Sequence, residues 1–142
     1  MNTAKLPAKF RGGCLCGALR YEAQGAPLNM GLCYCSDCRK ASGSGFIPFI
    51  GFRAEDVRFS GATRQFKSTA FRGGEAVRNS CSACASLVFG GIVGVDAQHT
   101  IYAGTLDDPS LFQPSIAIFT RDKPDWVVTP EGVHAFETMP GG

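Results

Sequence analysis

Three of the chain's cysteines fall within one short stretch, Cys33-Tyr34-Cys35-Ser36-Asp37-Cys38. The remaining cysteines form two further close pairs, which are Cys14 with Cys16 and Cys81 with Cys84. Sulfur atoms on one zinc ion lie roughly 3.7 Å apart, because Zn–S bonds are about 2.3 Å long and tetrahedral. Two residues along a flat strand are separated by about 6.6 Å. Each close pair must therefore curl into a tight turn, here called a knuckle, if it is to bind one ion.

The residues around the pairs suit such turns. Gly12, Gly13 and Gly17 flank the first pair, and the last pair lies in the small-residue run Ser80-Cys81-Ser82-Ala83-Cys84-Ala85-Ser86. Seven cysteines cannot form a closed disulfide set, and the first ten residues lack the apolar core of a secretory signal. We therefore expect a cytoplasmic protein whose thiols are reduced and bind zinc.

The seven cysteines divide naturally into four and three. Cys33, Cys35 and Cys38 can all reach one ion from a single segment. The two outer pairs are remote in sequence and would clamp a second ion through Cys14, Cys16, Cys81 and Cys84. Closed four-ligand zinc sites are structural, whereas three protein ligands leave a position for water or substrate. The sequence thus predicts that the set of four holds the fold and the set of three carries out the chemistry.

Two alternatives to this division stay open. One ion could instead be shared by the first four cysteines in the chain, Cys14, Cys16, Cys33 and Cys35. The set of three could also be closed by a fourth protein ligand, for which the candidates are His99, His134, Asp37 and Glu75. A closed second site would make both ions structural.

Composition and hydrophobic pattern predict a mainly β protein. Glycine accounts for 18 of 142 residues, above the ordinary usage of about 7%, and no long segment keeps a helical period. Short alternating segments, such as 18–23, 65–69 and 76–80, predict strands separated by turns. Residues 36–42 predict a short helical turn with Ser36 as its N-cap and Gly43 as its end.

The apolar segments extend this predicted sheet. Residues 46–52 predict a buried strand, in which Pro48 requires an edge position or a bulge. Residues 87–95 and 100–103 continue the sheet. After residue 124 the chain is expected to be irregular, with Trp126 and Phe136 packed on the body.

Charge and hydropathy argue against two classes of partner. The net charge is only +2 and no long basic run occurs, so a nucleic-acid partner is not expected. The apolar stretches are far shorter than the roughly 20 residues of a membrane helix. The sequence does not indicate the oligomeric state.

The motifs together resemble the glutathione-dependent formaldehyde-activating (GFA) family, which also includes centromere protein V. The resemblance runs from about residue 10 to residue 126. It rests on Gly12-Gly13-Cys14-Leu15-Cys16-Gly17-Ala18-Leu19-Arg20-Tyr21, Cys33-Tyr34-Cys35-Ser36-Asp37-Cys38-Arg39-Lys40-Ala41-Ser42-Gly43, Arg78-Asn79-Ser80-Cys81-Ser82-Ala83-Cys84, Gly104-Thr105-Leu106-Asp107-Asp108 and Trp126.

The resemblance implies a zinc-stapled β-tent of short antiparallel strands over residues 10–127, with residues 128–142 as a tail packed on or near it. It implies two zinc ions, a structural one on Cys14, Cys16, Cys81 and Cys84 and a catalytic one on Cys33, Cys35 and Cys38. The implied activity is that of a carbon–sulfur lyase, with glutathione as co-substrate. Its substrate would be an adduct of glutathione, or a similar thiol, with formaldehyde or another small aldehyde.

The sequence departs from the family pattern in three places, which involve four residues. Tyr34 replaces the usual histidine, Ser80 and Ala85 replace the usual phenylalanine and glycine around the last knuckle, and Ser115 follows Pro114 where a histidine is common. The zinc ligands survive all three changes. As a hypothesis, Arg39 or Lys40 attracts the carboxylates of glutathione and Ser42 hydrogen-bonds the substrate. The alternative function is a zinc-stapled binding module for a protein or nucleic acid, without catalysis.

Overall fold

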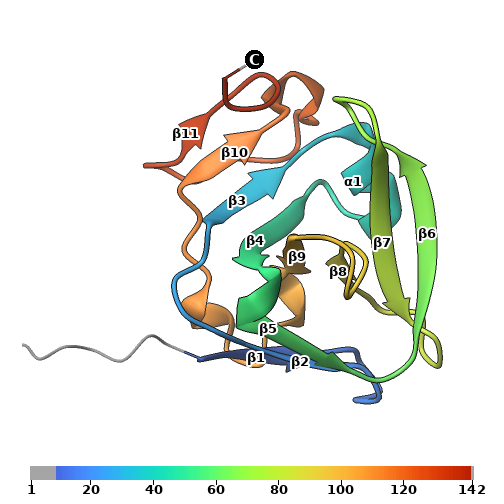
Figure 1. Ribbon diagram of the computed structural model, residues 1–142. Helices are drawn as coiled ribbons and strands as arrows, with labels where there is room; N and C mark the ends of the chain where they lie inside the picture. Colours follow the sequence, from blue (N-terminus) through green and yellow to red (C-terminus); the bar gives the residue numbers. More distant parts are fainter. Residues whose placement is uncertain (1–8, 142) are drawn as a thin grey trace, which may run out of the picture.

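The computed structural model describes residues 9–141, and these form the mainly β protein that the sequence predicts. The strands build two sheets, a smaller one below and a larger one curving above it (Figure 1). The smaller sheet is antiparallel, in the order β1-β2-β5. Its strands are β1 (Lys9–Gly13), β2 (Arg20–Gln24) and β5 (Val57–Ser60).

The larger sheet has eight strands in the order β11-β10-β3-β4-β9-β8-β7-β6. In sequence order they are β3 (Asn29–Cys33), β4 (Ile47–Arg53), β6 (Thr63–Thr69), β7 (Glu75–Cys81), β8 (Leu87–Gly90), β9 (Gln98–Tyr102), β10 (Ile116–Ile118) and β11 (His134–Ala135). The helical elements are α1 (Ser36–Ser42) and the 3-10 turns η1 (Ala54–Asp56), η2 (Ala103–Thr105), η3 (Pro109–Leu111) and η4 (Thr120–Asp122). The sheet curves so that the β6–β7 hairpin faces β3 and β4 across the molecule (Figure 1).

Two pairings in the larger sheet differ from the antiparallel strands that the family resemblance predicts. Strand β10 runs parallel to β3, and β11 runs parallel to β10. Parallel neighbours need a long connection. The chain supplies one between β3 and β10, because it passes through strands β4 to β9 before it returns.

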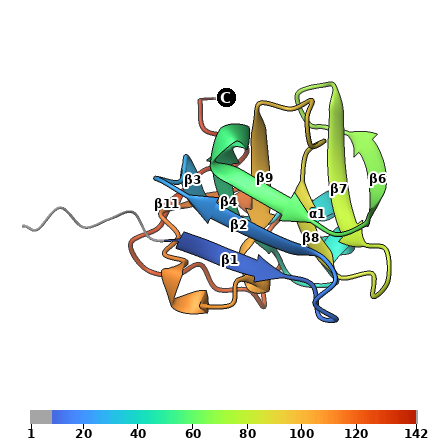
Figure 2. The same ribbon diagram turned by 60° about the horizontal axis from the view of Figure 1, so that its bottom comes forward.

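The main hydrophobic core lies between the smaller sheet and the central strands of the larger one, an arrangement seen from below in Figure 2. Alternate residues of β1 and β2, such as Phe10 and Tyr21, point inward and are buried, as the period of a half-buried strand requires. Phe10 packs edge-on against Phe52 of β4, with ring centroids 5.2 Å apart. Phe59 of β5 stacks on Phe89 of β8 at 3.7 Å. These contacts hold the smaller sheet against the larger.

Helix α1 occupies the predicted residues, but its N-cap is Cys35 rather than Ser36. The Sγ atom of Cys35 accepts a hydrogen bond from the backbone N–H of Cys38 at 3.3 Å. A cysteine thus takes the capping role that a serine usually has. The helix ends at Gly43 as predicted, where φ is 65°.

The predicted strand over 46–52 is β4, but Pro48 lies neither on an edge strand nor at a bulge. Strand β4 runs between β3 and β9, and Pro48 is in register with Leu32 of β3. Pairing with β9 begins only at Phe49. The proline, which has no N–H to donate, therefore lies just beyond the end of that ladder.

Two other predictions are corrected by the structure. Strand β8 is shorter than residues 87–95, because the chain turns at Gly91, where φ is 98° and a Cβ atom would lie 2.7 Å from the Nδ1 atom of His99. Trp126 does not pack on the body but is 74% exposed, and its neighbour Val127 takes the buried position instead. Phe136 is partly buried against the body, as predicted.

The last described residues return to the larger sheet. Strand β11 pairs with β10, so part of the predicted tail contacts the body. The domain boundary at residue 127 stays a prediction. Within residues 9–141, no helix combines the length and the apolar character needed to cross a membrane.

Candidate metal centres

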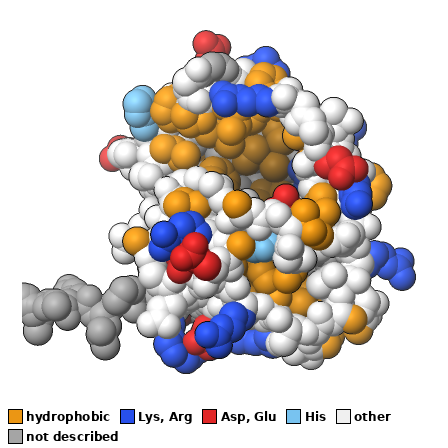
Figure 3. All heavy atoms as spheres, in the orientation of Figure 1, with side chains coloured by type: hydrophobic (Ala, Val, Ile, Leu, Met, Phe, Trp, Pro, Cys, Tyr) orange, Lys and Arg blue, Asp and Glu red, His pale blue; other side chains and the backbone are white. Residues whose placement is uncertain are grey.

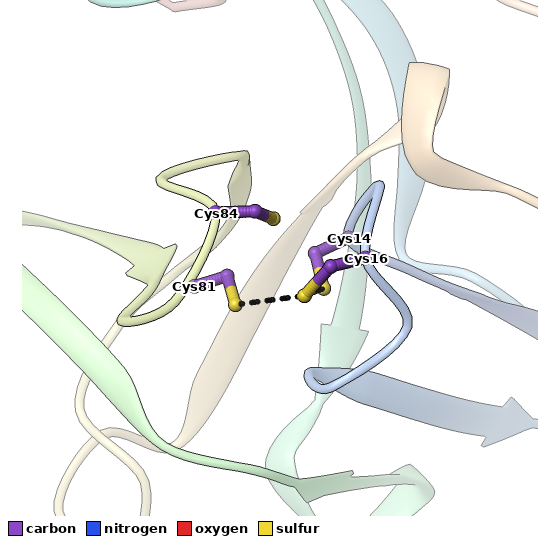
Figure 4. Close-up of side chains that lie close together, drawn as sticks. All are labelled: Cys14, Cys16, Cys81 and Cys84. Atoms are coloured by element: carbon purple, nitrogen blue, oxygen red, sulfur yellow. Dashed lines mark hydrogen bonds between the residues drawn. The ribbon is translucent and has the colours of Figure 1, made fainter.

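Four cysteines from two distant knuckles meet at one end of the molecule. The turn after β1 supplies Cys14 and Cys16, and the end of β7 with the following turn supplies Cys81 and Cys84. All four sulfur atoms lie within 4.8 Å of one another, and the four side chains point toward a common centre (Figure 4). We call this set the four-cysteine cluster. It brings together the two sequence-distant pairs that the four-plus-three division groups.

The sulfur spacing fits a zinc ion. Cys16 Sγ lies 3.6 Å from the Sγ atom of Cys14 and 3.8 Å from that of Cys81, close to the roughly 3.7 Å separation of thiolates on one zinc. Four soft sulfur donors are the ligand set of structural zinc sites. The four-cysteine cluster could therefore hold a zinc ion with protein ligands alone.

Backbone N–H groups and one serine surround these sulfur atoms. Leu19 donates its N–H to Cys14 Sγ at 3.2 Å, and this hydrogen bond lowers the pKa of the Cys14 thiol. Ser86 Oγ accepts the N–H of Leu15 at 3.1 Å and lies 3.2 Å from Cys84 Sγ, where its hydrogen bond lowers the pKa of that thiol. Ser86 thus joins the two knuckles, a role that sequence reasoning missed because it treated the residue only as small.

The remaining three cysteines come from one segment. Cys33 ends β3, Cys35 caps α1, and Cys38 lies in the first turn of that helix. Their sulfur atoms all lie within 4.8 Å of one another, so this three-cysteine cluster could also hold a zinc ion. Hydrogen bonds from Cys33 and Cys38 lower the pKa of Cys35, while the bond to Cys35 raises the pKa of Cys33.

The structure decides between the alternatives that the sequence left open. Cys14 and Cys16 do not join Cys33 and Cys35, so the other division of the cysteines is wrong. Among residues 9–141, no histidine, aspartate or glutamate completes the three-cysteine cluster. The candidate ligand His99 is buried in the main core and bonds the carbonyl of Gly90 at 3.1 Å.

The other proposed fourth ligands also lie outside the cluster. His134 stacks on Phe136 with ring centroids 4.5 Å apart, and Asp37 is exposed in the first turn of α1. Glu75 lines the cleft described below without joining the three sulfur atoms. Among residues 9–141, the three-cysteine cluster therefore offers three candidate ligands, and their role in holding a catalytic zinc stays a prediction.

The three-cysteine cluster opens on a cleft of about 630 Å³ between β3, β4 and β9 on one side and β7 on the other. Figure 3 shows this hollow on the face of the molecule, with hydrophobic side chains on its floor. Cys33 and Cys38 line it together with Phe49, Ile118 and Met139. The cleft also contains Tyr102, whose pKa burial raises to about 12, and Arg78 of β7.

A larger concave surface of about 870 Å³ covers the smaller sheet, but no cysteine lines it. Part of its charge is paired, since Glu22 lies 3.2 Å from Lys9 and 3.4 Å from Arg11. Because neither of the candidate metal clusters found among residues 9–141 lines it, this surface is a weaker candidate site than the cleft.

The residues predicted to bind substrate do not line the cleft. Ser42 donates its hydroxyl to the carbonyl of Cys38 at 2.7 Å, Lys40 is exposed, and the partly buried Arg39 has an Nε atom with no hydrogen-bond partner among the described residues. Their part in binding stays a prediction. The cation that does line the cleft is Arg78, which the sequence analysis quoted only as part of a motif. The sequence signal that could have identified Arg78 is its position, three residues before Cys81.

Comparisons with known proteins agree with this geometry. The family model described as "Glutathione-dependent formaldehyde-activating enzyme" matches residues 9–122. A crystal structure of a Rhodobacter sphaeroides protein is similar in fold, with a TM-score of 0.54 and 21% sequence identity over 73% of this chain and 96% of that one. No curated protein matches the chain significantly.

Proposed function

The chain belongs to the glutathione-dependent formaldehyde-activating family, and from this we propose that it is a zinc-dependent carbon–sulfur lyase. The proposed substrate is an adduct between glutathione, or a similar thiol, and formaldehyde or another small aldehyde. The observation that carries the proposal is the three-cysteine cluster, which has no fourth ligand within residues 9–141 and opens on a cleft. We place the protein in the cytoplasm, where glutathione is abundant and thiols stay reduced.

The two clusters would then have different roles. Cys14, Cys16, Cys81 and Cys84 would hold the structural zinc, and Cys33, Cys35 and Cys38 the catalytic zinc. When bound at three thiolates, zinc supplies a soft Lewis acid that lowers the pKa of a coordinated thiol and polarises a carbonyl oxygen.

The protein's own contribution is to position the reactants. In the forward direction the thiol sulfur adds to the carbonyl carbon, a carbon–sulfur bond forms, and the thiol proton ends on the carbonyl oxygen. The apolar floor around Phe49 and Ile118 would hold the two reactants together, and this proximity is the main source of acceleration for such an addition. The hydroxyl of Tyr102 is protonated at neutral pH, as tyrosine ordinarily is, and burial raises its pKa further, to about 12. It can therefore donate a hydrogen bond to that oxygen.

Residues on α1 that do not line the cleft would help to attract and bind the substrate. Arg39 and Lys40 follow Cys38 directly, and their charges would attract the carboxylates of glutathione toward the cleft. Ser42 would hydrogen-bond the substrate only by giving up its present bond to the carbonyl of Cys38.

The test is to add the zinc-loaded protein to glutathione and ¹³C-formaldehyde and to follow exchange between free and adduct carbon by NMR. We expect faster exchange than in buffer, and no acceleration with Cys38→Ser at equal protein concentration. A panel of other thiols and aldehydes then identifies the preferred substrate. A protein with both zinc ions that leaves every exchange rate unchanged would overturn the proposal.

A further inference from the structure

Arg78 connects the β6–β7 hairpin to the three-cysteine cluster. Its Nη2 atom lies 3.9 Å from Cys38 Sγ, and its Nη1 atom donates to Ser68 Oγ at 3.3 Å. The side chain is partly buried and lines the cleft. The guanidinium is therefore fixed at one wall of the cleft, beside a sulfur atom of the cluster.

Most of the hydrogen-bonding capacity of Arg78 is unused. A guanidinium carries five N–H donors, and only the two contacts above are found for it within residues 9–141. Its Nε atom is buried without a partner. No carboxylate of the described chain forms an ion pair with it. A buried donor on a cation is costly when it is left without an acceptor, so Arg78 has donors for a further anionic group besides the sulfur atom of Cys38.

The rest of the cleft lining shows where such a group would come from. Arg78 is the one lysine or arginine among the residues that line the cleft, and most of its neighbours there are apolar or glycine. The two acidic residues of the lining do not form an ion pair with Arg78. Asp96 accepts the N–H of Ile92 at 2.6 Å, and Glu75 is exposed. A carboxylate that enters the cleft with a ligand can supply this acceptor.

We propose that Arg78 is the specificity-determining residue of the cleft and that it binds a carboxylate of the thiol substrate. This inference rests on the proposed function. A planar guanidinium can hold a carboxylate through two parallel hydrogen bonds, which fixes its orientation as well as its charge. Because the same guanidinium contacts Cys38, the bound carboxylate places the substrate sulfur beside the three-cysteine cluster. The substrate class is thus carboxylate-bearing thiols, and neutral thiols of the same size are poor ligands.

The test compares two probes of nearly equal shape, 3-mercaptopropionate and 3-mercapto-1-propanol, by calorimetric titration of the zinc-loaded full chain. We expect the wild-type protein to bind the carboxylate probe at least tenfold more tightly. Arg78→Met, which keeps the aliphatic length without the donors, should bind both probes equally and keep its zinc content. Arg58→Met, on the smaller sheet, is the matched control and should keep the wild-type preference.

The outcomes separate this inference from the proposed function. Equal binding of both probes by the wild-type protein, or a preference that survives in Arg78→Met, overturns the role of Arg78 and leaves the enzyme proposal standing. Binding of neither probe by the zinc-loaded wild-type protein also overturns the role of Arg78, and the proposed function is then decided by the NMR exchange measurement alone. If Arg78→Met loses zinc or its fold, Arg78→Lys decides the matter. An undiminished preference in that variant overturns the proposal, and a preference reduced severalfold supports it.

Discussion

The two cysteine clusters have the same kind of ligand but lie in opposite surroundings. The four-cysteine cluster joins parts of the chain that are distant in sequence, since its close sulfur contact from Cys16 to Cys81 spans 65 positions. The three-cysteine cluster lies within one strand end and one helical turn. A metal ion in the first closes a long loop, whereas an ion in the second organises only its own segment. We infer that a site with four ligands from distant segments has a structural role, whereas one with three ligands from a single segment is free for chemistry.

The neighbours of the sulfur atoms strengthen the contrast. Around the four-cysteine cluster, the N–H of Leu19 and the hydroxyl of Ser86 form hydrogen bonds with the sulfur atoms. Both groups belong to the knuckles or to their immediate neighbours. Around the three-cysteine cluster, Cys38 faces a cleft and the donor Arg78. The three-cysteine cluster thus has beside it both an open cleft and the hydrogen-bond donors of Arg78 that have no acceptor among residues 9–141.

The largest difference between the two clusters is expected when one candidate ligand is removed from each. Cys81→Ser should leave the protein unfolded or insoluble, because structural zinc contributes about 10 kcal/mol or more of folding free energy, and a domain is stable by only about 5–15 kcal/mol. Cys38→Ser should stay soluble, keep most of its thermal stability and lose one zinc ion. Circular-dichroism melts and zinc analysis on both variants make the measurement.

The control for this pair is Ser82→Ala, which changes an exposed residue of the last knuckle without touching a ligand. It should keep both zinc ions and the wild-type melting temperature. Equal destabilisation by Cys81→Ser and Cys38→Ser would mean that both clusters are structural. The binding-module function would then become the better interpretation.

A chelator can compare how tightly the two clusters hold zinc without changing the sequence. A competing chelator of graded strength should remove zinc from the three-cysteine cluster first, because that ion has fewer protein ligands and faces a cleft. The first ion should leave without loss of the far-UV circular-dichroism signal, and the second should leave only with unfolding. Simultaneous loss of both ions and of the fold would contradict the division.

Much of this contrast could be read from the sequence, because close cysteine spacing directly constrains local geometry. The set of three follows from the spacing of Cys33, Cys35 and Cys38, whereas the grouping of the outer pairs was one of two divisions that the sequence left open. The cleft could not be predicted in this way, since it depends on how β7 faces β3 and β4 across a curved sheet. Arg78 enters the site only through that curvature. The parallel return of β10 beside β3 is likewise a long-range pairing without a local signal.

The backbone next to each cluster supplies an intermediate test. Within residues 9–141, the non-glycine residues with positive φ are Ala85, at 65°, beside the four-cysteine cluster, and Phe119, at 58°, beside the three-cysteine cluster. A left-handed conformation costs a non-glycine residue roughly 1–2 kcal/mol. Phe119→Gly should still destabilise by about 3 kcal/mol, because its buried side chain is lost. Ala85→Gly should instead stabilise by about 1 kcal/mol, because Ala85 is exposed and loses no packing.

Urea denaturation of the zinc-loaded variants measures both changes, and Ala83→Gly, at an exposed position of the same knuckle that is not among the positive-φ residues, is the control. That control should lose stability slightly, since glycine adds freedom to the unfolded chain. If Ala85→Gly also lost stability, the left-handed turn at the last knuckle would carry no strain.

The smallest expected effect concerns the ion pair between Arg20 and Asp107, which joins β2 to the turn before η3. The hydrogen bond from Arg20 holds the pKa of the Asp107 carboxyl below its usual value of 3.8. A lowered carboxyl pKa stabilises the fold above the unfolded value and loses that contribution as the pH falls through the folded one. Asp107→Asn should therefore cost a constant amount between about pH 6 and 8, where the wild-type carboxylate is charged throughout.

Both partners are exposed, so the cost should be only about 0.2–1 kcal/mol and should shrink in high salt. Thermal melts of the wild type and Asp107→Asn at low and high ionic strength give the difference, and Asp108→Asn is the neighbouring control. A loss of several kcal/mol, or one that changes between neutral and mildly alkaline pH, would mean that this ion pair helps to hold the first knuckle in place. The four-cysteine cluster would then not be the sole clamp at that end of the molecule, and its contrast with the three-cysteine cluster would be weaker than the sulfur geometry implies.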